Sequence, residues 1–297
     1  MNQPAVVDAI VVSYFSPEDV RNSCAALRRS AGVEVRLIVV DNGSASAPRI
    51  GPDPDDIVHE LGVNRGFGAA CNAGLALATA PWVVLSNQDV EPDVSAVRLL
   101  IDACEDHEAT GASHVVAGPA LVDGGGRRKE SWHRFPTPSR HVLSFLVGDG
   151  AGKIRNCAEV EEEAVVDWVS GAFLVGRRET FTLLGGFDER YFMYVEDVDL
   201  FARLRDAGGT CVWVPQASVR HDGGDRPIGA DLYAHTLRNW RRFHTSRSGR
   251  LPAGIVFASA IIGSVARGLL WLGRGRRRVE APAWGRMYLL GAVRALR

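Results

Sequence analysis

The chain has 297 residues, 46% of them hydrophobic and 23% charged, with 32 glycines and 14 prolines. This composition is typical of globular proteins and excludes a disordered chain, a collagen and a long coiled coil. The formal net charge of −1 argues against a nucleic-acid-binding protein. This average hides an uneven distribution: residues 238–297 hold thirteen arginines and one acidic residue, so this segment has a formal charge of +12 and the rest of the chain −13. We expect an anionic surface to attract the basic segment.

Cysteines and lysines exclude several kinds of site. The five cysteines are scattered, with no Cys-x-x-Cys pair, which indicates a reducing compartment and no zinc ribbon. Lys129 and Lys153 are the only lysines, and neither completes a Gly-x-x-x-x-Gly-Lys phosphate loop. Residues 1–12 lack the basic start and apolar core of a secretory signal, so we expect a cytoplasmic protein.

Apolar runs alternate with helical stretches in the first half of the chain, the pattern of a mostly parallel sheet covered by helices. The predicted strands cover 6–12, 35–40 and 82–85, and the predicted helices cover 17–30, 66–79 and 93–105. A polar cluster follows each strand: Ser13-Tyr14, Asp41-Asn42-Gly43-Ser44 and Ser86-Asn87-Gln88-Asp89. Because ligands bind outside the carboxyl ends of such strands, we expect these clusters to line one cleft.

The second half of the chain begins with a different composition. Residues 123–163 are rich in glycine, arginine and proline, and we expect loops there. Order returns with a predicted strand at 165–175, helices at 178–184 and 196–207, and a strand at 211–214.

The basic segment after residue 238 has helical character. Its uncharged run, 251–266, is sixteen residues long, shorter than the roughly 20 apolar residues that span a bilayer. We expect it to lie in the membrane interface, as part of a helix over 255–278. That helix would place Gly263, Arg267, Arg274 and Arg278 along one side, with Phe257, Trp271 and Trp284 as anchors. The alternative is a helix packed on the protein body with its arginines in water.

Asp89 is a candidate ligand for a divalent cation. Mg²⁺ and Mn²⁺ prefer oxygen ligands and keep several waters or substrate phosphates, so one aspartate can suffice when a diphosphate completes the shell. The alternative for Asn87 and Asp89 is an Asx-turn at the end of the strand.

Three carboxylates, Glu196, Asp197 and Asp199, open the predicted helix at 196–207. Carboxylates in a first turn commonly serve the helix dipole and capping. Glu196 and Asp199 share one face, whereas Asp197 points about 100° away, so the cluster can divide its roles between a cleft and the helix. His221 lies on a predicted loop, where it is either structural or a nitrogen ligand beside a metal.

The stretch Asn64-Arg65-Gly66-Phe67-Gly68 opens a helix after a strand. It fails as a dinucleotide-binding fingerprint because the third glycine position falls at Cys71 and the segment follows the third β unit rather than the first. The helix N-terminus can still favour an anion.

Taken in order, these segments resemble a family-2 glycosyltransferase of the GT-A fold, an α/β architecture with a Rossmann-like, mostly parallel central sheet. The resemblance covers about residues 6–221. It is carried by the strand-end clusters, by Asn64–Gly68 through Asn72-Ala73-Gly74, by Ser170-Gly171-Ala172, and by Gly185-Gly186-Phe187-Asp188-Glu189 running to Tyr194-Val195-Glu196-Asp197-Val198-Asp199-Leu200, followed by Arg203 and Gly208. The pattern is similar to the bacterial rhamnosyltransferase-like branch, whose members extend surface glycans, often on polyprenyl-diphosphate carriers.

The resemblance implies an inverting reaction, a nucleotide-diphospho-sugar donor and Mg²⁺ or Mn²⁺. Asp197 would be the catalytic base, Asp89 would hold the metal, and His221 would be a further contact to the metal or the diphosphate. Glu196 and Asp199 would lie on the acceptor side. The implied donor site is Ser13, Tyr14, Asp41, Asn64, Gly66, Asn72, Asn87 and Gly171. Asn87 stands where the family often has an aspartate, and a neutral amide is a poorer ligand for a hard cation.

We therefore expect a GT-A catalytic domain over 1–237, with a nucleotide-sugar half at about 1–122 and an acceptor half at about 164–237. A helical, basic, membrane-associating tail would cover 238–297 on the inner face of the cell membrane. The favoured donor is dTDP-L-rhamnose and the favoured acceptor a cell-wall or surface glycan on a lipid carrier. The alternatives are a UDP- or GDP-hexose donor and a non-catalytic sugar-nucleotide or glycan-binding scaffold; a nucleotidyltransferase would leave Glu196-Asp197 without a role.

Overall fold

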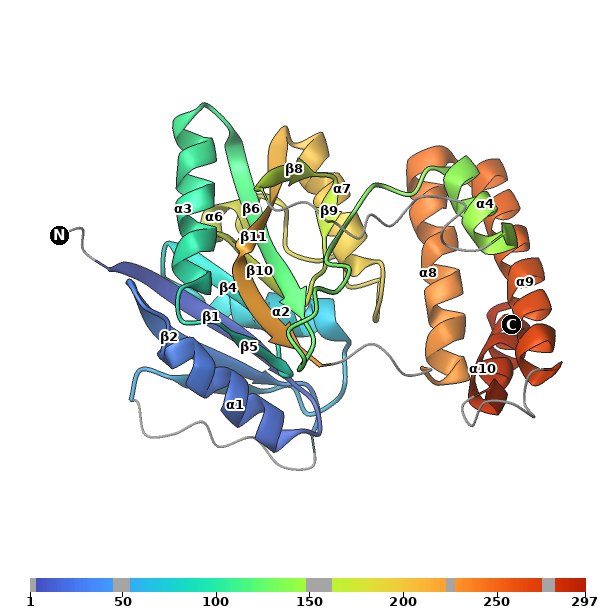
Figure 1. The fold of residues 1–297 in the computed structure, drawn as a ribbon, viewed down its shortest axis with the longest axis horizontal. Helices are drawn as coiled ribbons and strands as arrows, with labels where there is room; N and C mark the ends of the chain where they lie inside the picture. The colour runs from blue at the N-terminus through green and yellow to red at the C-terminus, as the bar shows by residue number, and fades with distance from the viewer. Residues whose placement is uncertain (1–3, 45–53, 148–161, 223–227, 274–280) are drawn as a thin grey trace. The chain divides into compact units, whose positions relative to one another are not determined.

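The structure is a computed structural model that describes residues 4–44, 54–147, 162–222, 228–273 and 281–297. The described chain forms two compact units, an α/β unit and a helical unit. The α/β unit contains the strands with α1, α2, α3, α6 and α7, and the helical unit contains α4, α8, α9 and α10 (Figure 1). The predicted domain boundary at 237/238 falls inside α8, which lies wholly in the helical unit.

A mixed sheet forms the centre of the α/β unit. Its strands are β1 (Ala5–Ser13), β2 (Val33–Asp41), β3 (Ile57–Glu60), β4 (Trp82–Asn87), β5 (Val90–Pro92), β6 (Ser113–Val122), β8 (Ala164–Val166), β10 (Phe173–Arg177) and β11 (Gly209–His221). Their order is β3-β2-β1-β4-β10-β6-β11-β5, and β8 pairs with β11. A separate ribbon joins β7 (Trp132–His133) and β9 (Trp168–Val169).

The neighbouring strands β3, β2, β1 and β4 are all parallel to one another, which confirms the predicted fold class. β1 pairs in parallel with β2 and β4, and β6 pairs in parallel with β11. β5 and β8 each run antiparallel to β11, and β10 runs antiparallel to both β4 and β6. Its direction brings the residues before Phe173 beside the carboxyl end of β4, where Asn87 N–H donates to the Ala172 carbonyl at 2.9 Å.

Among the described residues, five helices cover the sheet: α1 (Pro17–Arg28), α2 (Phe67–Leu77), α3 (Ala96–Ala109), α6 (Arg178–Leu183) and α7 (Glu196–Asp206). Alternate residues of β1, among them Val7 and Val11, pack into one apolar core with α1 and α3. The intervening Ile10 faces α2, where Gly74 approaches so closely that a β-carbon there would lie 2.4 Å from the Ile10 side chain. Helices therefore cover both faces of the sheet, as buried parallel strands require.

Several predicted elements differ from the structure. The expected strand at 165–175 is divided among β8, β9 and β10, since Ser170–Ala172 leave the sheet. Ser16 precedes α1, but its hydroxyl contacts the Asp19 carboxylate and does not cap the backbone. The expected loop region at 123–163 contains β7 and the helix α4 (Pro138–Val147). Proline suits the first turn of a helix, where its missing N–H has no partner to lose.

The helical unit packs α4, α8 (Ala230–Ser248), α9 (Arg250–Gly273) and α10 (Ala281–Ala295) together. Small residues allow close contact: a β-carbon on Gly263 of α9 would lie 1.9 Å from the Phe145 carbonyl of α4. Arg267 donates to that same carbonyl at 2.7 Å. The predicted side containing Arg267 thus faces α4, and Arg274 and Arg278 lie outside the described residues.

The helix α9 is longer than the uncharged run that predicted it. It has 24 residues, about 36 Å at the usual rise, and Arg250–Leu272 is long and apolar enough to cross a membrane by length and composition. The length of α9 therefore does not exclude a spanning helix, and its location in the membrane interface stays a prediction.

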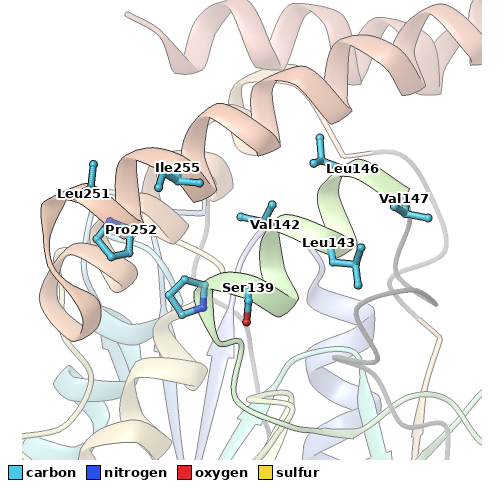
Figure 2. Close-up of a pocket in the computed structure, with 9 residues that line it drawn as sticks. Ser139, Val142, Leu143, Leu146, Val147, Leu251, Pro252 and Ile255 are labelled. Atoms are coloured by element: carbon cyan, nitrogen blue, oxygen red, sulfur yellow. The ribbon is translucent and has the colours of Figure 1, made fainter.

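An apolar groove of about 560 Å³ lies between α4 and α9 (Figure 2). Its lining is Pro138, Ser139, Val142, Leu143, Leu146, Val147, Leu251, Pro252 and Ile255. Several of these side chains are more than 40% exposed: Leu143, Leu146, Val147, Leu251 and Ile255. Apolar surface gathered in this way marks a site of protein or lipid contact.

Two buried histidines link α4 to α8. Nδ1 of His141 lies 2.8 Å from Nε2 of His244, so one ring donates to the other. Trp240 and Phe145 pack against the His141 ring. Burial lowers the pKa of His141 to about 3, with a smaller contribution from His244, and burial lowers the pKa of His244 to about 4.

Acid should destabilise the helical unit. An unfolded histidine titrates near pH 6.5, so each neutral buried ring stabilises the folded state above that pH and loses this contribution as pH falls toward its folded pKa. With both rings acting, the free energy of unfolding should fall by about 2.7 kcal/mol per pH unit at its steepest, below about pH 6. Denaturant unfolding followed by tryptophan fluorescence measures this slope. His141→Leu/His244→Leu should flatten it, and an unchanged slope would contradict the assignment.

Candidate functional site

The carboxyl ends of three neighbouring parallel strands bring predicted donor-site residues together. Ser13 ends β1 and pairs in register with Asp41 at the end of β2, while Asn87 at the end of β4 pairs with the residue before Ser13. Ser13 and Asp41 are each only 2% exposed. The Asp41 carboxylate accepts the Ser44 N–H at 3.2 Å, which shapes the turn that follows β2.

Gln88 fixes the backbone at Tyr14 and was not assigned a role from the sequence. Its side-chain oxygen accepts the Tyr14 N–H at 2.6 Å, and its amide nitrogen donates to the Tyr14 carbonyl at 3.0 Å. The Tyr14 side chain is exposed beside this bridge. Gln88 thus joins the polar clusters after β1 and β4, a pairing that strand order reveals and local sequence does not.

A turn before α2 brings Asn64 and Gly66 to the end of β2. The side-chain oxygen of Asn64 accepts the Gly66 N–H at 2.9 Å and the Asn42 amide at 3.1 Å. Asn42 also donates to the Gly66 carbonyl at 3.2 Å and accepts the Arg65 N–H at 2.8 Å. Asn42 belongs to the polar cluster that follows β2, and through these bonds it ties the turn to the sheet.

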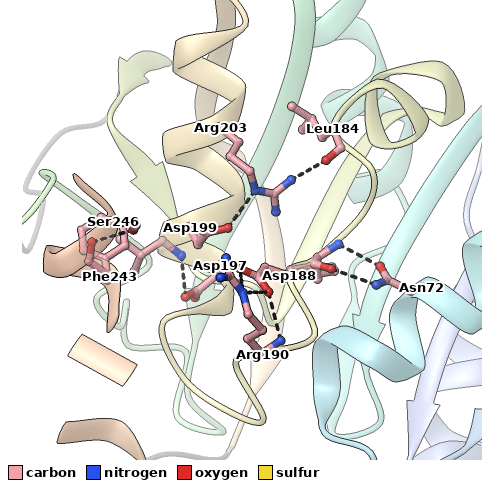
Figure 3. Close-up of polar contacts among 11 residues, drawn as sticks. Asn72, Leu184, Asp188, Arg190, Asp197, Asp199, Arg203, Phe243 and Ser246 are labelled. Atoms are coloured by element: carbon pink, nitrogen blue, oxygen red, sulfur yellow. Dashed lines mark hydrogen bonds and ion pairs between the residues drawn. The ribbon is translucent and has the colours of Figure 1, made fainter. Parts of the chain in front are cut away.

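The amide of Asn72 is engaged inside the protein. Its nitrogen donates to the Phe187 carbonyl at 2.9 Å and its oxygen accepts the Phe187 N–H at 2.8 Å (Figure 3). The same nitrogen lies 3.1 Å from the Glu189 carboxylate. These contacts tie α2 to the segment that leads into α7. The predicted contact between Asn72 and the nucleotide-sugar donor stays a prediction, and the structure shows that this side chain also connects α2 to Phe187.

Asp197 lies at the start of α7, against the loop that precedes β10. Its Oδ2 accepts the Gly171 N–H at 3.1 Å, and its Oδ1 accepts the Val198 N–H at 2.8 Å. A β-carbon on Gly171 would lie 3.2 Å from the Asp197 β-carbon, so glycine suits this close approach. Because Asn87 bonds to the next residue, Ala172, Asp197 lies beside the carboxyl end of β4.

Glu196 and Asp197 occupy different environments although they are adjacent. Glu196 is 6% exposed, and its Oε2 has no hydrogen-bond partner among the residues that the structure describes. Burial, and then the charge of Asp197, holds the pKa of Glu196 well above its usual range. Burial also raises the pKa of Asp197, but the two backbone N–H donors oppose it. Of the two carboxyls, Glu196 is therefore the one that is held more strongly in its neutral form.

Asp199 has a partner on its own helix. Its Oδ2 accepts Nε of Arg203 at 2.7 Å, and the same guanidinium donates to the Leu184 carbonyl at 2.5 Å (Figure 3). Asp199 is 6% exposed. The predicted acceptor-side role of Asp199 stays a prediction, while these bonds anchor α7 to the end of α6.

Asp89 and His221, the two predicted metal contacts, lie together. Nε2 of His221 is 3.5 Å from Oδ2 of Asp89, and Lys129 donates to the His221 carbonyl at 3.3 Å. Burial alone would raise the pKa of Asp89, but the hydrogen bond and charge of His221, with the charge of Lys129, outweigh it, so the pKa is lowered. No third histidine, cysteine or carboxylate completes a metal-binding group with them in the described part of the chain.

Comparisons with known proteins identify the family of this chain. Residues 8–155 match the family model described as glycosyl transferase family 2. N-acetylglucosaminyl-diphospho-decaprenol L-rhamnosyltransferase of Mycobacterium tuberculosis is 31% identical over 236 residues, covering 73% of this chain and 76% of that protein. Rhamnosyltransferase WbbL of Escherichia coli is 38% identical over 91 residues, 31% of this chain and 34% of the relative.

A solved structure shows the same fold. The mannosyltransferase PcManGT of Pyrobaculum calidifontis, in complex with GDP-Man and Mn²⁺, superposes with a TM-score of 0.52 at 16% identity, over 98% of this chain and 86% of that one. The architecture is that of a GT-A glycosyltransferase. The sheet, the strand-end cluster and the rhamnosyltransferase relatives together show that this chain is an enzyme and belongs to glycosyltransferase family 2.

Proposed function

We propose that this enzyme transfers L-rhamnose from dTDP-L-rhamnose to a lipid-linked glycan, with inversion at the anomeric carbon. The observation that carries the proposal is the Asp197 carboxylate, held by two backbone N–H groups beside the carboxyl end of β4. The choice of sugar rests on relatives named for rhamnosyl transfer. A UDP- or GDP-hexose is the alternative donor. A protein with the same fold binds GDP-Man, so the experiment below includes both classes of donor.

Asp197 would act as the base in a single displacement. Its carboxylate takes the proton of the acceptor hydroxyl while that oxygen bonds to the anomeric carbon. The bond from the anomeric carbon to the diphosphate breaks on the opposite face, and the nucleoside diphosphate leaves with the electron pair. The acceptor gains the sugar, and no covalent enzyme intermediate forms.

The donor's nucleotide would lie over the ends of β1 and β2. Asp41 would contact the base or ribose, with Ser13 and Tyr14 beside it. Asn64, Gly66, Asn87 and Gly171 would complete the donor side, and Asn72 would reach it from α2. The closeness of Ser13, Asp41 and Asn87 in the sheet register supports this arrangement.

A divalent cation fits the pair Asp89 and His221. One anionic oxygen and one imidazole nitrogen suit Mn²⁺ or Mg²⁺ when a diphosphate supplies further oxygens, and the lowered pKa of Asp89 keeps this carboxylate charged. When bound, the ion would neutralise charge that develops on the leaving diphosphate.

Asp89→Ala should weaken donor binding only when metal is present. Titration calorimetry with dTDP, with and without Mn²⁺, should show that the wild type gains affinity from the ion, whereas the variant gains at most about a tenth as much, because phosphate oxygens and water are poor replacements for a carboxylate. Asp93→Ala, nearby in sequence and outside this pair, is the control. Equal metal dependence in Asp89→Ala and wild type would exclude Asp89 as a ligand.

The exposed apolar face of the helical unit would bring the enzyme to its acceptor at the inner membrane surface. Leu251, Ile262 and Leu269 of α9 are 77%, 61% and 60% exposed, and the α4–α9 groove continues this surface. The opposite side of α9, including Ala253, Val256 and Ala260, is buried, which favours a helix that lies on the membrane over one that is surrounded by lipid. Exposed arginines of 238–297, among them Arg250 and Arg286, would meet anionic headgroups.

Leu251→Ser/Ile255→Ser/Ile262→Ser should release the enzyme from vesicles. Losing three buried aliphatic groups should cost about 1.5 kcal/mol or more each, so binding should fall at least a hundredfold. Co-sedimentation with phosphatidylglycerol vesicles measures it, and Ala258→Ser, on the same exposed side, is the control. Alkaline carbonate should also release the wild type; retention there would indicate a spanning helix instead.

A nucleotide-sugar panel tests the proposed function most directly. Purified enzyme with Mn²⁺ or Mg²⁺ and a polyprenyl-diphosphate-linked glycan acceptor is offered dTDP-rhamnose, UDP-hexoses and GDP-mannose, with nucleotide release and product mass as readouts. We expect turnover with dTDP-rhamnose and a deoxyhexose added to the acceptor. Turnover with a UDP- or GDP-hexose alone would replace the proposed donor.

A further inference from the structure

The backbone just before the proposed base has an unusual conformation. Tyr194 and Val195 have φ values of 64° and 76°, in the left-handed region. Among the described non-glycine residues only Phe15 and His114 also have positive φ. A β-branched residue such as valine is a true outlier there, because its side chain crowds the backbone. Such a turn persists only where its surroundings hold it, and it ends two residues before Asp197.

Asn239, on the buried side of α8, contacts this turn. It is 3% exposed, and its amide nitrogen donates to the Met193 carbonyl at 3.0 Å and to the Tyr194 carbonyl at 3.1 Å. Its side-chain oxygen accepts Nη1 of Arg242 at 3.1 Å. Two carbonyls on one side and a guanidinium on the other fix the orientation of the amide, since only its nitrogen can donate and only its oxygen can accept.

We propose that Asn239 is a positioning residue: it holds the left-handed turn at Tyr194 and Val195 and so sets the direction in which the Asp197 side chain points. The two hydrogen bonds grip consecutive carbonyls, and this fixes the peptide plane between them. If the turn relaxed toward negative φ, the start of α7 would rotate, and the Asp197 carboxylate would lose its alignment with the Gly171 N–H. This inference rests on the proposed role of Asp197 as base.

Asparagine is suited to this position by chemistry as well as by size. Aspartate would fill the same space but would place a negative oxygen against two carbonyl oxygens, and alanine would leave both carbonyls buried without donors. Glycine at 195 would adopt the same φ without crowding. The effect of removing the Asn239 hydrogen bonds should therefore depend on whether residue 195 is valine or glycine. This dependence distinguishes a positioning role of Asn239 from a general contribution to the stability of α8.

The test is a double-mutant cycle in the full-length enzyme with Asn239→Ala and Val195→Gly. Turnover, KM and dTDP affinity are measured for each, with unfolding midpoints. We expect Asn239→Ala to lower kcat by about tenfold to a hundredfold, since a small misplacement of a reacting group has effects of this size, while the dissociation constant of dTDP changes less than about twofold. In the Val195→Gly background the same substitution should lower kcat by less than about threefold, because the relaxed turn needs no clamp. Asn239→Asp is the second variant should alanine fail to fold, and Thr245→Ala, exposed on α8, is the control.

Several outcomes would overturn the proposal. Equal losses of kcat in both backgrounds would mean that Asn239 supports the fold in general, and an unchanged kcat would mean that the turn holds itself. Asp197→Asn, assayed in parallel, separates the two claims: inactive Asp197→Asn with fully active Asn239→Ala refutes the clamp alone, whereas active Asp197→Asn refutes the base.

Discussion

Asp197→Asn should abolish sugar transfer. The amide keeps the size of the side chain but cannot take the proton of the acceptor hydroxyl, and general-base catalysis is worth about 10²- to 10⁴-fold. We therefore expect kcat to fall by at least a hundredfold, while the affinity for dTDP changes little because the proposed donor side lies on β1, β2 and β4. Because the pKa of Asp197 is raised, activity should fall on the acid side at a higher pH than for an ordinary aspartate. Product formation with the lipid-linked acceptor, followed by mass, measures the loss.

Two other variants show whether the effect belongs to Asp197. Asp206→Asn makes the same chemical change at the exposed far end of α7 and should leave turnover within about twofold, as expected for a surface substitution. Glu196→Gln replaces a carboxyl that is held neutral, so it should cost less than Asp197→Asn. A greater loss from Glu196→Gln would move the base to Glu196, and substantial turnover by Asp197→Asn would contradict the proposed mechanism.

The sequence predicted the sheet edge of the site well because its signals are local. β1, β2 and β4 each contain an apolar run, at 9–12, 37–40 and 82–85, that is followed by polar residues. The parallel arrangement then brings Ser13, Asp41 and Asn87 to one edge. Asp89 and His221 also meet as expected, although 132 positions apart in the numbering, because β11 ends beside β5.

The strand β6 could not be predicted because Gly118 and Pro119 interrupt its apolar run. The structure tolerates both for specific reasons. Val169 packs so closely that a β-carbon on Gly118 would lie 2.5 Å from it, and β11 shifts register directly after Val214, the residue that pairs with Pro119. A proline has no N–H for the ladder, so an irregularity beside it removes the conflict. The sequence of β6 contains no signal of this register shift in β11.

The tertiary contacts that hold the site were also hidden from the sequence. Asn72 bonds to Phe187 and Asn239 bonds to Met193, across separations of 115 and 46 residues. Each asparagine lies within a helix, where no local pattern distinguishes it from a residue that faces water. The left-handed turn at Tyr194 and Val195 is equally unsignalled, since neither residue favours that conformation. Local sequence predicts elements and their polar ends, whereas these positions depend on partners brought together by the fold.

Gly66→Ala should be among the most destabilising single substitutions in the α/β unit. Gly66 has φ 89° and ψ 166°, a conformation essentially confined to glycine, and costs of about 1–3 kcal/mol attend such backbone strain in other residues. A β-carbon would also lie 1.9 Å from the Phe192 carbonyl oxygen, which the backbone must move to relieve. That carbonyl accepts the Phe67 N–H, so the start of α2 would shift with it.

We expect Gly66→Ala to lower the free energy of unfolding by about 3 kcal/mol or more, since strain and steric collision add. Gly62→Ala is the matched control: Gly62 also has positive φ, 72°, but a β-carbon there meets nothing within 4 Å, so only the conformational strain of about 1 kcal/mol should appear. Urea unfolding followed by circular dichroism compares the two. Equal losses of unfolding free energy in the two variants would show that the backbone at Phe192 moves aside without a free-energy cost. A larger loss at Gly66 would show that this contact fixes the turn that carries Asn64 to the end of β2.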